Sequence, residues 1–209
     1  MFLPGVNLVL GLPGETKETY RLNFDFLKTI IDEGLLLRRI NIRKVVPVRG
    51  TRLWGIHWRQ KAMLRNSRSF VDRVRSDIDR PMLRAAYRVG RKLKGLVAEI
   101  QQGATTFCRF PGSYPIVVGV EGKIVPRKVI DGIVVDHGYR SLTALRYPVD
   151  VNKCRGSTLV MFPGIGQARS ARIIRSRPIK SRADLERALG PDPPSPSSID
   201  LISRASEIE

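Results

Sequence analysis

Two glycines and two arginines near the end of the chain have a spacing that could bind a phosphate group. Gly164 and Gly166 flank Ile165, and the next six residues supply Arg169 and Arg172. The glycines permit a tight hairpin between two helices, while the isoleucine fills the gap between them. Backbone N–H groups at the start of the second helix can then bind phosphate, and such contacts are independent of base sequence. The alternative is a hairpin used for packing or protein contact.

The two cysteines limit the metal chemistry available to this chain. Cys108 and Cys154 lie 46 positions apart and form no CxxC motif. Two cysteines alone cannot supply a four-ligand zinc site. We therefore expect two separate thiols in a reducing cytoplasm, and the sequence indicates no catalytic residue and no metal site.

The charge of the chain favours a polyanionic partner. The formal net charge is +18, and the stretch from Arg38 to Lys94 carries 18 Lys/Arg residues against three Asp. Such an excess is typical of proteins that bind nucleic acid, although a solvated basic surface would give the same count. No apolar run approaches the ~20 residues of a membrane span, so we expect a cytoplasmic protein with no membrane contact.

The first elements that the sequence predicts form one β–α–β unit over residues 5–48. Val6–Leu10 is an apolar run typical of a buried parallel strand. Thr16 is a candidate N-cap, and Gly34 is expected to end the helix. The helix has one apolar face, formed by Tyr20, Phe24, Leu27, Ile30 and Ile31. A second strand is predicted over Ile40–Val48.

One β–α–β unit cannot close a parallel sheet, because such sheets are normally covered on both faces and contain several strands. We therefore expect either a missing N-terminal part or a partner chain that supplies it. The alternative is an unusual small fold in which other strands flank the first one.

Two motifs within this unit carry a resemblance to a known family. Gly5–Thr16, with the sequence GVNLVLGLPGET, is similar to the late-strand motif of radical S-adenosylmethionine (SAM) barrels, especially methylthiotransferase-like members. Val46–Leu53, with the sequence VPVRGTRL, resembles the strand and turn that follow in that family. Residues 1–53 are therefore similar to the C-terminal part of a radical SAM α/β barrel.

The resemblance implies a cofactor site. In the family, these two strands supply part of the SAM pocket, so Val9 and Gly11 from the first strand would lie beside the adenine. Val46, Pro47 and Val48 would complete that wall from the second strand.

The loop Gly11–Gly14 also has two simpler interpretations. It can be merely a tight strand-to-helix turn. It can also be a phosphate-binding loop, but the sequence lacks the G-x-x-x-x-G-K-[ST] spacing and Glu15 would repel a phosphate.

The chain departs from the family in its cysteines. Radical SAM proteins hold a four-iron four-sulfur cluster with a CxxxCxxC motif, which is absent here. Because such clusters need thiolate ligands, we expect no cluster on this chain. The complete family member would use both SAM and the cluster.

Residues 54–102 are predicted to form a basic helical region. A helical apolar stripe runs through Met82, Leu83, Ala86, Tyr87, Val89, Leu93, Leu96 and Val97. Pro81 is expected either to break this pattern or to open a new helix. The arginines and lysines lie largely off the stripe, where they could contact a nucleic-acid backbone or simply face solvent.

Residues 103–150 are predicted to form a small all-β barrel. Short β-rich runs, including one at Lys123–Val125, alternate with turn signals every 8–12 residues. The position after a radical SAM-like segment resembles that of the TRAM domain, an OB-like barrel that contacts RNA. The resemblance makes four residues candidates for phosphate contact, namely Arg109, Arg127, Lys128 and Arg140.

Residues 154–209 are similar to the helix-hairpin-helix family. The segment from Ser157 to Ile174 matches its pattern L-x-x-L-P-G-I-G-x-x-x-A-x-x-I. Ser181 and Asp184 fit a capping box that opens a third helix, and a last helix is expected near Ile199–Ile208.

These expectations combine into a fold class and two functional hypotheses. We expect an incomplete α/β barrel, a small all-β barrel and an α-helical hairpin domain. The first hypothesis is a truncated radical SAM-like protein whose complete form modifies a substrate on or near nucleic acid. The alternative is a non-enzymatic DNA- or RNA-binding module that retains only the tail of an enzyme. A structural subunit that docks on an acidic partner is a third, weaker interpretation.

Overall fold

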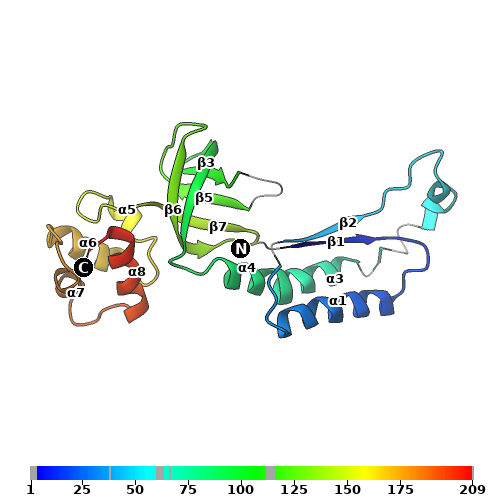
Figure 1. Ribbon diagram of the computed structural model, residues 1–209, viewed down its shortest axis with the longest axis horizontal. Coiled ribbons are helices and arrows are strands. Elements are labelled where there is room, and N and C mark those ends of the chain that lie inside the picture. The colour runs from blue at the N-terminus through cyan, green and yellow to red at the C-terminus, as the bar shows by residue number, and fades with distance from the viewer. Residues whose placement is uncertain (1–3, 38, 60–63, 66, 112–115, 209) are drawn as a thin grey trace. The chain divides into compact units, whose positions relative to one another are not determined.

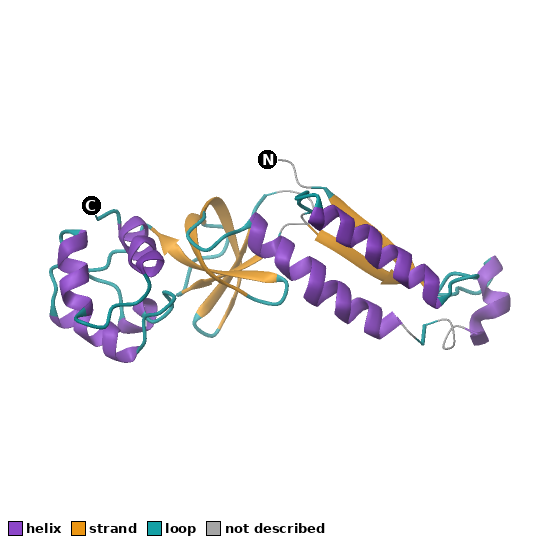
Figure 2. Cartoon of the chain, turned by 90° about the horizontal axis from the view of Figure 1, so that it is seen from below, coloured by secondary structure: helices purple, strands orange, loops and turns teal. Residues whose placement is uncertain are grey.

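The computed structural model describes residues 4–37, 39–59, 64–65, 67–111 and 116–208. The chain divides into two compact units, Met1–Ala86 and Tyr87–Glu209, whose elements are labelled in Figure 1 and coloured by type in Figure 2. Each unit has its own hydrophobic core.

Unit 1 begins with the predicted β–α–β unit, which the structure confirms. Strands β1 (Gly5–Leu10) and β2 (Arg39–Lys44) pair in parallel along their whole lengths. Helix α1 (Lys17–Asp32) connects them. Strand β2 is shorter than predicted. The last hydrogen bond to β1 runs from the Val45 N–H to the carbonyl of Leu10, and after it the chain leaves the sheet and reaches a turn at residues 49–50.

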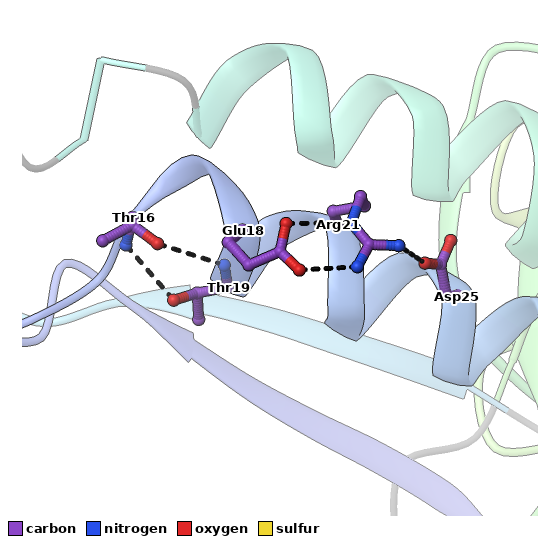
Figure 3. Close-up of polar contacts among 5 residues, drawn as sticks. All are labelled: Thr16, Glu18, Thr19, Arg21 and Asp25. Carbon is purple, nitrogen blue, oxygen red and sulfur yellow. Dashed lines mark hydrogen bonds and ion pairs between the residues drawn. The ribbon is translucent and has the colours of Figure 1, made fainter.

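Helix α1 has the start and end that the sequence predicts. Thr16 and Thr19 form a reciprocal capping box, in which each side chain accepts from the other residue's backbone N–H (Figure 3). Arg21 bridges Glu18 and Asp25 along the exposed face (Figure 3). Gly34 follows the helix with φ of +72°, a left-handed conformation that glycine adopts without steric cost.

The rest of unit 1 is helical. A 3₁₀ segment, η1 (Arg52–Arg59), precedes three consecutive helical stretches. These are α3 (Ser67–Val74), the π-helical turn η2 (Arg75–Asp79) and α4 (Arg80–Ala86). Pro81 lies just after the π-helical turn and does not end the helix, because a widened turn accommodates a residue that has no N–H to donate.

The core of unit 1 lies on one side of the strand pair. Figure 1 shows α1 and α3 on the same side of β1 and β2, and both helices contribute to one buried cluster with the strands. Its members are Leu10, Tyr20, Phe24, Leu27, Leu37, Ile40, Phe70, Val74, Ile78 and Met82. On the opposite face, Asn41 donates a hydrogen bond to Asn7 across the two strands at 2.9 Å. Among the described residues no further strand pairs with either outer edge, although Arg75 donates a hydrogen bond to the carbonyl of Ile40 in β2 at 2.7 Å.

Unit 2 contains the predicted small barrel. Five strands close in the order β3-β4-β5-β7-β6. Their bounds are β3 Lys92–Gln102, β4 Thr105–Arg109, β5 Val117–Glu121, β6 Val129–His137 and β7 Ser141–Tyr147. Strands β5 and β7 pair in parallel, and all other neighbours are antiparallel. Lys123–Val125, which the sequence predicts to be a strand, is a loop in the structure.

The prediction that residues up to 102 are helical is wrong after Ala86, because Lys92–Gln102 is a barrel strand. Its register against β6 shifts between Leu93 and Leu96, and Gly95 within this bulge has φ of +72°. The bulge turns both leucines into the barrel interior. Leu93 and Leu96 are therefore both buried at a spacing of three residues, which is typical of a helix, although the backbone here is extended.

The tail of unit 2 contains four helices packed against the barrel. They are α5 (Gly156–Leu159), α6 (Gln167–Arg175), α7 (Arg182–Leu189) and α8 (Pro196–Ser206). Ser181 and Asp184 form the predicted capping box at the start of α7. One buried cluster joins Ile133, Val135 and Leu145 of the barrel to residues of the tail such as Phe162 and Ile165.

Candidate functional site

The turn between α5 and α6 places its two glycines in different environments. Gly164 has φ of +78°, and a Cβ atom there would lie 2.9 Å from Cβ of Pro194. Glycine is therefore required at this position by the chain itself. Gly166 has an extended backbone and open space on its Cβ side, with no atom within 4 Å. Between them, Ile165 is 4% exposed and belongs to the core.

Gly166 is the N-cap of α6 and lies at the protein surface. The first intrahelical bond runs from Ser170 N–H to the carbonyl of Gly166. The N–H groups of Gln167, Ala168 and Arg169 consequently lack intrahelical acceptors. The exposed residues from Gly166 to Ala168 thus present backbone donors and the positive end of the helix dipole to solvent, which suits an anion.

The two predicted phosphate-binding arginines both contact the tail itself. The Arg169 guanidinium donates to the carbonyls of Gly164, at 2.8 Å, and Asp192, at 3.0 and 3.2 Å. It also forms an ion pair with the Asp192 carboxylate at 3.0 Å. Arg172 lies against Gly190, where a Cβ atom would meet its Nη1 at 2.8 Å. Arg169 therefore ties the hairpin to the α7–α8 loop, while Arg172 packs against the end of α7.

The four basic residues predicted to contact phosphate lie in three different parts of the barrel. Arg109 on β4 forms an ion pair with Glu99 at 3.1 Å. Arg127 and Lys128 are exposed in the loop before β6, where Arg127 has φ of +67°. Arg140 is exposed between β6 and β7.

Among the predicted cofactor residues, Val9 lies near the carboxyl end of β1, and Val46, Pro47 and Val48 follow that of β2. Because the two strands are parallel, these ends lie at the same edge of the sheet. Val9, Val46 and Val48 are 48%, 72% and 58% exposed, whereas Pro47 is half-buried. Three apolar side chains are therefore presented to solvent near one sheet edge. Such a surface could pack against a flat apolar group.

Gly11 serves the loop itself. It has φ of +88°, and a Cβ atom there would lie 3.0 Å from Leu64 and 3.2 Å from Val45. Its N–H donates to the Glu15 carboxylate at 2.7 Å, and Tyr20 donates its hydroxyl to the same oxygen at 3.1 Å. A carboxylate thus occupies the position that a phosphate-binding loop would keep for its ligand. Burial and the hydrogen bond to Glu15 raise the pKa of Tyr20 to about 12.

The cysteines do not provide a cluster site. Cys108 is fully buried in the barrel, and Cys154 is half-buried before α5. Burial raises the pKa of both thiols. Among the residues that the structure describes, no three His, Cys, Asp or Glu side chains come together as a metal site. Two thiols in separate environments do not fit a four-iron cluster, which needs several thiolates around one point.

The fold defines a parallel β–α–β unit followed by a five-stranded barrel whose core is shared with a four-helix tail. No protein-family model matches the chain. An uncharacterized protein of Archaeoglobus fulgidus is 41% identical over 187 residues, which cover 88% of this chain and 34% of the relative. An uncharacterized protein of Methanocaldococcus jannaschii is 41% identical over 145 residues, covering 68% of this chain and 26% of that relative.

The chain thus spans about a third or less of the length of these relatives. Among its described helices, none combines the length and apolar character that crossing a membrane requires.

Proposed function

We propose that unit 2 binds the backbone of a nucleic acid through the hairpin between α5 and α6. The observation that carries this proposal is Gly166, an exposed N-cap with open space around it and three helix N–H groups behind it. The neighbouring Gly164 and Ile165 are fixed by the packing of the chain. The hairpin is therefore a rigid frame that presents donors to an anion.

The topology of the barrel supports this role. A closed barrel in which the third and fifth of five strands pair in parallel has the strand order of an OB fold. Barrels of this class commonly bind oligonucleotides. We assign the barrel to an OB-like type, as the predicted resemblance to TRAM domains implies.

We further propose that unit 1 is the later part of a radical SAM-type barrel in a longer protein. The parallel strand pair supports this, because its helices cover one face and leave the other open. The exposed valines Val9, Val46 and Val48 would hold the adenine of SAM when it is bound. The complete protein would modify a substrate on or near nucleic acid, with the cluster held by residues outside this chain.

The alternative function is a nucleic-acid-binding module without enzyme activity. The cysteine pair favours it, because these thiols do not fit a cluster. Equilibrium dialysis with labelled SAM separates the two proposals: retention by the chain, reduced by Val46→Asp, supports the barrel, and no retention supports the module.

Gly166→Asp tests the nucleic-acid proposal. Aspartate is a good N-cap residue, so the fold should be unharmed, but its charge would stand where the phosphate binds. We expect Gly166→Asp to weaken binding to a labelled DNA duplex at least tenfold in fluorescence anisotropy.

The matched control is Gly166→Asn, which has the same size and capping ability but no charge. It should bind much more tightly than the aspartate variant. Equal affinities of the two variants, with both folded by circular dichroism, would contradict the proposed hairpin site.

A further inference from the structure

A second basic surface lies at the other end of α5. The end of β5, the loop after it, β7 and the segment leading into α5 line one groove. Three of its lining residues are cations from three different elements, namely Lys123, Arg146 and Arg155. We call this surface the junction groove, because the barrel and the tail both contribute to it.

The three cations of the junction groove are available to a ligand. All are exposed, and their side chains form no hydrogen bond or ion pair with any residue that the structure describes. This distinguishes them from Arg169, whose guanidinium is held by the tail.

Two carboxylates, Glu121 and Asp150, also line the groove, and both accept hydrogen bonds from the chain. Glu121 accepts a hydrogen bond from Ser157 at 3.0 Å. Asp150 accepts from the N–H groups of Asn152 and Lys153 and pairs with the Lys153 ammonium at 3.4 Å. Asp150 is thus paired with a cation, whereas Glu121 keeps its charge, and the three unpaired cations of the groove outnumber it.

The groove has an apolar wall. It is formed by the exposed Ala104 and Pro148 and the half-buried Cys154, with Leu145 and Val149 buried beneath them. An apolar wall bordered by cations matches a nucleotide, whose base or sugar can contact the wall while its phosphates meet the charges. A base can reach such a wall only when it is unstacked from a duplex.

Helix α5 connects this groove to the hairpin. Its four residues span about 6 Å along the helix axis, with Arg155 before the first turn and the hairpin turn after the last. Ser170 of α6 donates to the carbonyl of Gly156 at 3.2 Å, which fixes α5 against α6. A strand leaving the groove therefore has the hairpin donors nearby.

We propose that the junction groove binds a single strand of DNA or RNA, with one nucleoside against the apolar wall at Pro148 and Cys154 and the adjoining phosphates on Lys123, Arg146 and Arg155. This inference rests on the proposed nucleic-acid function and adds its substrate class, a single-stranded segment. The hairpin holds the backbone of the same or an adjoining strand.

The test is the triple variant K123Q/R146Q/R155Q of the whole chain, titrated with labelled single-stranded DNA and RNA at several salt concentrations. Each lost phosphate contact to a single strand removes about 0.7 from the slope of log affinity against log salt. We expect the slope to fall by about 2, with duplex binding unchanged. The control K17Q/K44Q/K180Q removes the same charge from exposed lysines outside the groove and should leave the slope nearly unchanged.

A bound strand should also slow alkylation of Cys154, with the buried Cys108 as internal reference. The inference is overturned if the triple variant and the control lose slope equally, or if Cys154 is not protected. It is also overturned if polyglutamate competes as well as the oligonucleotide, since the partner would then be an acidic protein. If the unmodified chain binds neither single strands nor duplex, the proposed function itself fails.

Discussion

At the scale of single residues, the sequence indicates which residues belong to the hairpin, but it does not reveal which other residues their side chains contact. Gly164 and Gly166 are equivalent in the motif, yet only the first is required by packing, against Pro194 far along the chain. Arg169 and Arg172 likewise contact Asp192 and Gly190. No local spacing reveals such distant partners, so the assignment of both arginines to phosphate could not be checked from sequence.

Tyr20 supplies a residue-scale prediction about pH. Its raised pKa, about 12 against the ordinary 10, means that the unfolded chain loses the phenol proton first as pH rises. The contribution of Tyr20 to stability is thus complete below pH 10 and is lost as pH rises through about 12. Urea unfolding followed by tryptophan fluorescence should show this loss, and Tyr20→Phe should reduce its steepness. Identical pH dependence in both proteins would contradict the role of the Tyr20–Glu15 hydrogen bond.

At the scale of elements, the predictions that were confirmed are those that depend on residues a few positions apart in the sequence. The Thr16 N-cap and the Ser181 capping box were predictable because each capping residue and its partner lie three residues apart. The Gly34 helix end was predictable for the same reason. Strand β3 was not, since its bulge at Gly95 places leucines inside the barrel at a helix-like spacing. Only pairing with β4 and β6, far along the chain, reveals the extended backbone.

The capping box of α7 gives an element-scale prediction. Ser181→Ala removes the acceptor for the Asp184 N–H and should cost about 1 kcal/mol of the unfolding free energy of unit 2. Urea unfolding followed by circular dichroism measures the change. Ser181→Asn should retain most of the unfolding free energy, because asparagine is also a good N-cap. A loss of stability in Ser181→Asn as large as that in Ser181→Ala would argue against a capping role.

At the scale of the whole molecule, the barrel and the tail of unit 2 share one core. Ile133, Val135 and Leu145 of the barrel pack in the same cluster as tail residues. The sequence predicts a barrel and a helical domain as separate parts, because linker composition around residue 150 does not show that the two apolar surfaces meet. Stability of the nucleic-acid-binding surface should therefore depend on both parts.

Ile165→Ala tests this shared core. Truncating a buried isoleucine typically lowers the unfolding free energy by about 2–5 kcal/mol. If the core is shared, this loss should destabilise the barrel as well as the tail. We expect the urea midpoint for alkylation of Cys108, in the barrel, to fall in this variant, as mass spectrometry of labelled peptides would measure. An unchanged midpoint at Cys108 would show that barrel and tail unfold independently.

The outer edge of β1 affects how this protein behaves at high concentration. Every second residue of the strand directs its N–H and carbonyl away from β2, and no described residue pairs with them. An exposed edge of this kind is a template for a strand from another molecule. Molecules in which this edge of β1 stays uncovered should therefore form intermolecular β-sheet and scatter light as they are concentrated, even when both units are correctly folded.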